Sequence, residues 1–105
     1  MTLKELEQRI GDSFESDMRL MRAKNHDYAG DKDALYNLRR FGFFGIVVRL
    51  SDKFSRLEQF AKQRKLRVKD EGIRETLRDI RIYSHLAEIL LSEEMRPDTK
   101  IREKP

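Results

Sequence analysis

Hydrophobic residues recur at helical spacing in three long segments of this chain. The first segment opens at Thr2, and its apolar positions are Leu3, Leu6, Ile10, Phe14, Met18 and Met21. Comparable stripes run from about residue 45 to 65 and from about residue 71 to 95. Spacing of three or four residues is typical of one face of an amphipathic helix. No segment alternates as a half-buried strand does, so the pattern predicts an all-α helical bundle of three long helices.

Polar residues at the segment boundaries predict where helices begin. Thr2 and Glu5 have the spacing of a capping box, in which each side chain bonds the backbone N–H of the other residue. Asp33 is a candidate N-cap for one additional short helix over Ala34 to Arg40. The sequence therefore predicts a fourth, short helix between the first two long ones.

Two connections are expected on either side of that short helix. Residues 25–33 mix cations, anions and Tyr28, and they form a longer stretch than a simple helix connection needs. Loops of this kind commonly carry function, so we expect this one to close the mouth of a site. Gly42-Phe43-Phe44-Gly45 is expected to be a turn whose two phenylalanines are buried.

Composition narrows the class of protein. The 105 residues are 40% charged and 38% hydrophobic, with no Cys and a net charge of +4. This length suits one domain, which we expect over residues 1–95, followed by a flexible tail over 96–105. The lack of Cys excludes a disulfide scaffold, a thiolate zinc site and a cysteine nucleophile. No apolar stretch approaches the roughly 20 residues of a membrane span, and no signal-peptide pattern opens the chain, so we expect a cytoplasmic protein without a membrane partner.

Each long helix also places a charged residue inside its apolar arc. At about 100° per residue, Asp17, Lys53 and Asp79 fall within the arcs of the first, second and third helices. An unpaired buried charge is costly, so these groups must be paired or must face a polar cleft. Two interpretations stay open: an ion-pair network that fixes the helix register, or a cleft whose carboxylates hold a metal ion or water and whose cations hold phosphates.

Neighbouring charges extend this candidate site. Arg49 and Arg56 lie one turn to either side of Lys53. On the third helix, three acidic residues follow one another at a spacing of four: Glu71, Glu75 and Asp79. Carboxylates on one side of a helix can supply oxygen ligands to Mg²⁺, although a solvated acidic edge has the same spacing.

Three segments of the chain have the form of recognisable motifs. Lys24-Asn25-His26-Asp27-Tyr28 has the form K-N-x-D-Y. A second segment, G-x-x-x-R-x-x-D-K-x-x-R-L, is made of Gly45, Arg49, Asp52, Lys53, Arg56 and Leu57. A third consists of Val68-Lys69-Asp70-Glu71, Glu75-Thr76-Leu77, Asp79 and Tyr83. In this order and spacing, across roughly residues 20–90, they resemble the nucleotide modification associated domain 1 family, small helical proteins common in bacteriophages.

The resemblance implies a role around nucleotides and a helix arrangement similar to that of MazG-like nucleotide pyrophosphohydrolases. Those enzymes hold Mg²⁺ at a triphosphate with an E-x-x-E pair on one helix and an E-x-x-D pair on the next. This chain departs from that pattern, because its second helix offers only Asp52 and its third offers Glu75 and Asp79 at a spacing of four. Whether the chain is an enzyme therefore stays open.

Carried onto this chain, the resemblance gives the motif residues expected roles. The nucleotide is expected to contact Lys24, Asn25, Asp27, Tyr28, Arg49, Lys53 and Arg56. Mg²⁺ is expected at Asp52, Glu71, Glu75 and Asp79. Glu75 and Asp79 would be the catalytic acids if water attacks a nucleoside triphosphate with the help of the metal.

Three functions remain compatible with the sequence. The first is nucleotide processing, either as Mg²⁺-dependent hydrolysis or in support of phage nucleotide modification. The second is non-enzymatic binding of a nucleotide, or of nucleic acid through the cations Lys62, Arg64, Lys65, Arg67 and Lys69, although a solvated helix end is the commoner reason for such a run. The third is a structural interaction protein that keeps the ion pairs and binds no ligand. Wide apolar arcs on so short a chain also predict a homodimer.

Overall fold

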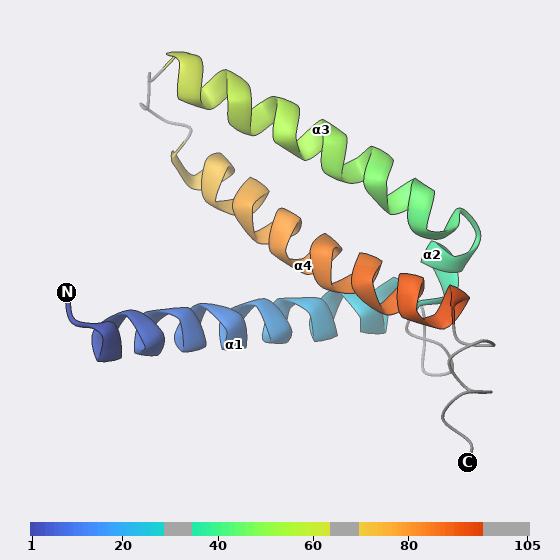
Figure 1. Cartoon of the computed structure of the whole chain (residues 1–105), viewed down its shortest axis with the longest axis horizontal. Helices are drawn as coiled ribbons and strands as arrows, with labels where there is room; N and C mark the ends of the chain where they lie inside the picture. Colours follow the sequence, from blue (N-terminus) through green and yellow to red (C-terminus); the bar gives the residue numbers. More distant parts are fainter. Residues whose placement is uncertain (29–34, 64–69, 96–105) are drawn as a thin grey trace. The chain divides into compact units, whose positions relative to one another are not determined.

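The computed structural model describes residues 1–28, 35–63 and 70–95, and the side chains of residues 25–28, 37, 70 and 71 lie outside this description. The helices are α1 (Leu3–Tyr28), α2 (Tyr36–Arg39), α3 (Gly42–Gln63) and α4 (Asp70–Glu94) (Figure 1). The described residues contain no strand, which confirms the predicted all-α class with three long helices. None of the described helices combines the length and the apolar character that crossing a membrane requires.

The chain divides into two compact units, Met1–Tyr36 and Asn37–Pro105. The first unit contains α1, and the second contains α3, α4 and most of α2. A single domain over residues 1–95 stays a prediction. The predicted tail over 96–105 lies outside the described residues.

The α1 helix begins as its sequence predicts and ends later than expected. The Thr2 N–H donates to Glu5 Oε1 at 2.9 Å, and the Glu5 N–H donates to Thr2 Oγ1 at 3.1 Å. This reciprocal pair confirms the capping box, which satisfies two backbone donors that have no partner inside the helix. The predicted loop over 25–33 is wrong for residues 25–28, which are helical because no Gly or Pro lies between Gly11 and Gly30 to end the helix. Residues 29–33 lie outside the described part of the chain.

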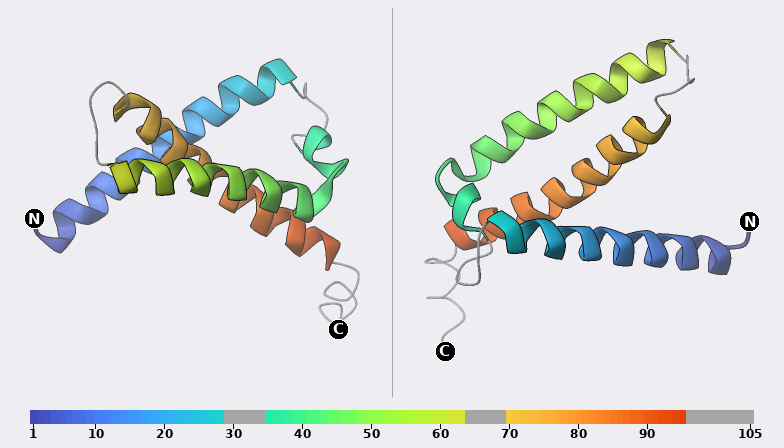
Figure 2. Two further views of the ribbon diagram at one scale, coloured as in Figure 1. Left: turned by 90° about the horizontal axis from the view of Figure 1, so that it is seen from above. Right: turned by 180° about the vertical axis from the view of Figure 1, so that it is seen from behind.

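In the second unit, α3 and α4 form an antiparallel helical hairpin. Figure 1 and the right view of Figure 2 show the two helices next to each other and running in opposite directions. Among the described residues of this unit, the buried apolar ones are Ile46 on α3 and Ala87 and Leu90 on α4. The observed helices differ from the expected bounds near 45–65 and 71–95 by only a few residues. The hairpin is the frame on which the candidate site is built.

The chain reverses between α2 and α3 within residues 37–45, which we name the α2–α3 corner. The α2 element is a single four-residue turn, so the longer helix predicted over 34–40 is not shown by the described residues. The expectation of a turn over 42–45 is wrong, because α3 already begins at Gly42. Gly42 has a φ of 67°, a conformation that only Gly adopts at little cost, so one residue makes the reversal. Gly45 then donates its N–H to the Phe41 carbonyl at 3.3 Å and continues the helix.

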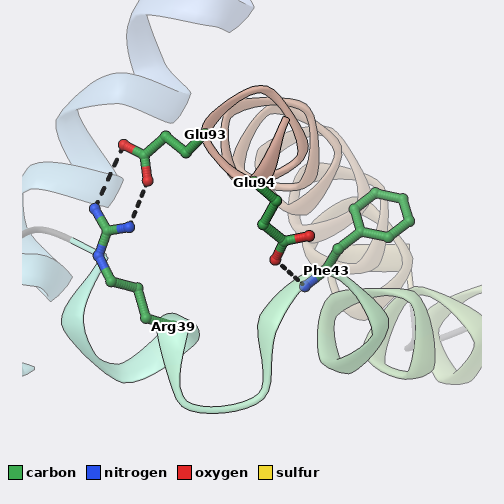
Figure 3. Close-up of polar contacts among 4 residues, drawn as sticks. All are labelled: Arg39, Phe43, Glu93 and Glu94. Carbon is green, nitrogen blue, oxygen red and sulfur yellow. Dashed lines mark hydrogen bonds and ion pairs between the residues drawn. The ribbon is translucent and has the colours of Figure 1, made fainter. Parts of the chain in front are cut away.

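The last turn of α4 is bonded to this corner (Figure 3). Arg39 donates two hydrogen bonds to Glu93, one from Nη1 to Oε1 and one from Nη2 to Oε2 at 3.4 Å. The Phe43 N–H donates to Glu94 Oε2 at 3.4 Å. Because the first N–H groups of a helix lack partners within it, and because that end carries partial positive charge, a carboxylate is well placed there. The end of α4 thus caps the start of α3.

Candidate functional site

One predicted pair of charges meets between the two helices of the hairpin. Lys53 Nζ on α3 lies 2.9 Å from Asp79 Oδ2 on α4, and the two side chains are 19% and 27% exposed. Both residues fall within the apolar arcs of their helices, so antiparallel packing turns them toward each other. The expectation that charges from separate helices meet is confirmed for this pair. Each charge is partly withdrawn from water and is compensated by the other.

One turn earlier on α3, Arg49 contacts Tyr83 of α4. Arg49 Nη1 donates to the Tyr83 hydroxyl at 3.3 Å, and the guanidinium carbon lies 5.9 Å from the centre of the Tyr83 ring. This geometry combines a hydrogen bond with a cation–π contact. Arg49, Lys53, Asp79 and Tyr83 together form a continuous set across α3 and α4, which we name the polar face.

Asp52 and Arg56 pair with each other and not across the hairpin. Arg56 Nε lies 3.9 Å from Asp52 Oδ2 within α3, and both side chains are more than half exposed. A second pair of this kind, Lys62 with Glu58 at 3.8 Å, follows further along the helix. Exposed pairs at this spacing contribute little to stability and are screened by salt. The structure thus places Asp52 and Arg56 on the solvent side of α3.

The predicted metal ligands are only partly brought together. Glu75 is exposed on α4 one turn before Asp79, and the Glu71 side chain lies outside the described residues. Within the described part of the chain, no three side chains of the Asp, Glu, His or Cys type gather as they would around a metal ion. The described residues therefore do not build a protein cage for Mg²⁺, and no chemical step is assigned to the metal here.

The motif residues of α1 belong to the first unit. Lys24 is exposed there, and Asn25, Asp27 and Tyr28 lie in the last turns of the helix with side chains outside the description. Asp17, the third charge expected inside an apolar arc, is buried at 5% exposure. The roles expected of the α1 motif residues stay predictions.

Sequence reasoning missed a hollow beside the α2–α3 corner. Its volume is about 400 Å³, and its walls include Leu38, Phe41, Phe44, Val48 and Arg49. The expectation that Phe44 is buried is wrong, because its side chain stands 74% exposed at the start of α3. Arg49 belongs to both the hollow and the polar face, so the two are continuous. The signal in the sequence is the set of aromatic residues around Gly42 and Gly45, of which Phe41 and Phe44 line the hollow.

Comparison with protein families, with curated proteins and with solved structures finds no match for this chain. The resemblance to the nucleotide modification associated domain 1 family therefore rests on the motif residues alone and stays a prediction. What the arrangement offers chemically is two cations one turn apart, each oriented by a side chain of the facing helix.

Proposed function

We propose that this chain binds the phosphate groups of a nucleotide at its polar face. The observation that carries the proposal is the pairing of Lys53 with Asp79 beside that of Arg49 with Tyr83. A nucleotide's phosphates need several converging donors, and Arg and Lys are the residues that supply them. The motif resemblance points to the same ligand class.

Both cations retain donors for a ligand while they keep their contacts with α4. A guanidinium has five N–H donors and an ammonium has three, whereas Arg49 uses one on Tyr83 and Lys53 contacts one oxygen of Asp79. Tyr83 and Asp79 therefore act as positioning residues that hold the cations. Because the side chains are ordered before the ligand arrives, less conformational freedom is lost on binding.

Mg²⁺ enters this proposal together with the phosphates. Mg²⁺ keeps several waters and is commonly held by one or two carboxylates plus substrate phosphates, without a cage made only of protein. Glu75 and Asp79 would be the carboxylates nearest to such an ion, because they lie one turn apart on α4. The proposal predicts that Mg²⁺ strengthens triphosphate binding more than monophosphate binding.

Calorimetric titration with ATP and dTTP, with and without Mg²⁺, tests the proposal. Replacing Arg49 with Ala or Lys53 with Met should weaken binding about tenfold or more, since each removes a charged hydrogen bond. The matched control is Arg56→Ala, which removes an equal charge from the solvent side of α3 and should change affinity less than about threefold, as expected for exposed charges. Absence of binding by the wild-type chain to any nucleoside mono-, di- or triphosphate would overturn the proposal.

A rival function follows from the same pair. If Lys53 and Asp79 serve only to fix the helix register, replacing both with Met and Leu should leave the fold stable and every ligand affinity intact. The phosphate proposal expects the double variant to fold and to lose nucleotide binding. Far-ultraviolet circular dichroism and the same titration separate the two outcomes.

If the chain is an enzyme, it should hydrolyse the nucleoside triphosphate that it binds. Incubation with a nucleoside triphosphate and Mg²⁺, followed by assay of released phosphate and pyrophosphate, should show product that disappears in Asp79→Asn. Binding without product assigns the chain to the non-enzymatic class. Nucleic-acid binding through the run 62–69 would instead give an affinity for DNA or RNA that falls steeply with salt and is unchanged in Lys53→Met.

We also propose that two copies associate through the start of α1. Leu3, Leu6 and Ile10 lie on one stripe of that helix and are exposed, and a second copy offers an identical apolar stripe. Light scattering after size exclusion should give a dimer mass for the wild type and a monomer mass for Leu6→Glu with Ile10→Glu. Arg9→Glu, on the polar side of α1, is the matched control and should remain dimeric.

A further inference from the structure

We propose that the hollow beside the α2–α3 corner holds the base of the nucleotide whose phosphates lie at the polar face. The inference rests on the proposed function and adds to it a location and a mode of recognition for the base. The ligand chemistry it requires is a flat aromatic ring joined to a phosphate. A free nucleotide or one residue of a single-stranded nucleic acid can supply that chemistry.

The hollow has the size and the lining of a small-molecule site. Its volume of about 400 Å³ lies within the roughly 300–1,000 Å³ typical of ligand pockets. Leu38, Ile46 and Val48 give it apolar walls, and the backbone of Gly42 and Gly45 forms another part. All these residues belong to the second unit, so the hollow is built by one compact part of the chain.

Two phenylalanines stand at this hollow with their rings open to solvent. The side chains of Phe41 and Phe44 are 67% and 74% exposed, although both line the hollow. Large exposed aromatic patches commonly mark binding sites, and aromatic faces are the usual platforms on which bases stack. The Arg40 guanidinium already lies over the Phe41 ring, 5.7 Å from its centre, which shows that this ring accepts a flat cationic partner. A base stacks on the same kind of surface.

The positive charge of Arg49 and Lys53 favours a ligand that carries negative charge beside its apolar part. Arg49 contributes to its wall, and Lys53 follows one helical turn further along α3. A purely apolar occupant, such as the stripe of a second copy, would leave the Arg49 guanidinium without a negative partner. A base attached to phosphate fills the apolar walls and supplies that negative charge.

The lining also predicts how selective the site is. Among the described residues that line the hollow, Arg49 is the only one with a polar side chain. Base edges are distinguished by hydrogen bonds from polar groups, whereas stacking accepts every base. The hollow should therefore favour nucleotides over bare polyphosphate while discriminating weakly between bases, with affinities for ATP and dTTP within a few fold of each other.

Calorimetric titration with ATP, dTTP and inorganic tripolyphosphate tests the inference. Phe44→Ala should lower the affinity for both nucleotides about tenfold. It should change the affinity for tripolyphosphate less than about twofold, because only the contact with the base is removed. Phe54→Ala is the matched control, because Phe54 is also an exposed phenylalanine of α3 but does not line the hollow. It should leave all three affinities unchanged. Nuclear Overhauser contacts between base protons and the Phe44 ring protons provide a readout that does not depend on affinity.

Each outcome has a separate meaning. If nucleotides and tripolyphosphate bind equally well and Phe44→Ala changes neither, the inference is overturned while the phosphate proposal survives. If neither class of ligand binds, the phosphate proposal fails and the inference fails with it. If Phe44→Ala dissociates a dimer without changing nucleotide affinity, a second copy occupies the hollow and the inference is overturned. Loss of affinity for both dTMP and an oligothymidine of eight residues in Phe44→Ala supports the inference, and the tighter of the two wild-type affinities identifies the source of the base.

Discussion

The two ends of the α3–α4 hairpin use their charged residues in different ways. At the end that adjoins α2, the bonds join distant parts of the chain: Arg39 pairs with Glu93, and the Phe43 N–H donates to Glu94. Toward the opposite end, Glu58 pairs with Lys62 inside α3 at a spacing of four residues. We name these the corner end and the far end. Lys53 and Arg56 are only three residues apart, yet one reaches the facing helix and the other stays at the solvent surface.

In a helix with many charged residues, a candidate site is therefore marked by the face on which a charged side chain lies. The presence of a charge alone does not mark one. Lys53 lies in the apolar arc of α3 and must meet a partner where water is scarce. Arg56 lies outside the centre of that arc and meets a partner of its own helix in water. Ligand binding should therefore be concentrated on the side of α3 that faces α4, and tertiary stability at the corner end, where Leu90 is buried.

The largest difference between the two ends should appear in apolar truncations of α4. Leu90, at the corner end, is 2% exposed, whereas Leu77, toward the far end, is 40% exposed. Leu90→Ala should lower the free energy of unfolding by about 3 kcal/mol, because a buried leucine leaves a cavity. Leu77→Ala should cost less than about 1 kcal/mol, as expected for a surface side chain. Urea unfolding followed by circular dichroism measures both, and equal losses would show that the two ends are equally packed.

Two glycines should respond to the same substitution with opposite signs. A Cβ at Gly45 would lie 2.5 Å from the Phe41 Cβ, whereas a Cβ at Gly72 would meet nothing within 4 Å. Gly45→Ala should destabilise the chain by about 1–2 kcal/mol, because the clash outweighs the better helix propensity of Ala. Gly72→Ala should stabilise it by about 0.5–1 kcal/mol. Melting temperatures that rise for both variants would contradict the close packing at the corner.

The smallest expected difference in stability is between the ion pair that joins α3 to α4 and the ion pair that stays within α3. A double-mutant cycle on Lys53 and Asp79 should give a coupling free energy of about 1–2 kcal/mol, between the values for exposed and buried pairs. The same cycle on Arg56 and Asp52 should give at most about 0.5 kcal/mol. The cycles are measured by urea unfolding at low and high salt, and only the second coupling should vanish in high salt. Equal couplings would remove the distinction between the polar face and the solvent side of α3.

The helices could be predicted from sequence because their apolar stripes are long and regular. The contact between Lys53 and Asp79 could be anticipated for the same reason. A charged residue within an apolar arc is costly to bury unless a partner of opposite charge faces it. The capping box at Thr2 and Glu5 needs only local spacing and was also predictable. These features depend on a few neighbouring residues and on the turn of a helix.

The corner could not be predicted, because it depends on tertiary geometry. No local sequence pattern indicates that Gly42 adopts a positive φ. The hydrogen bond between the Phe43 N–H and Glu94 depends on the chain reversal at that residue. The expected burial of Phe44 followed from residue type alone, and its exposure follows from where the reversal points that face of α3. The hollow was missed with it, because its walls come together only once the reversal is in place.

Because the Phe43 amide is hydrogen-bonded to Glu94, hydrogen exchange at that amide reports when the end of α4 detaches from α3. Its acceptor arrives from 51 positions later in the chain, so the proton is shielded only while the last turn of α4 is docked. Amides deeper in α3 are held by their own helix and exchange with deuterium only when that helix unravels. Deuterium exchange at the single Phe43 site thus records detachment of α4 without a probe attached to the chain or an added ligand.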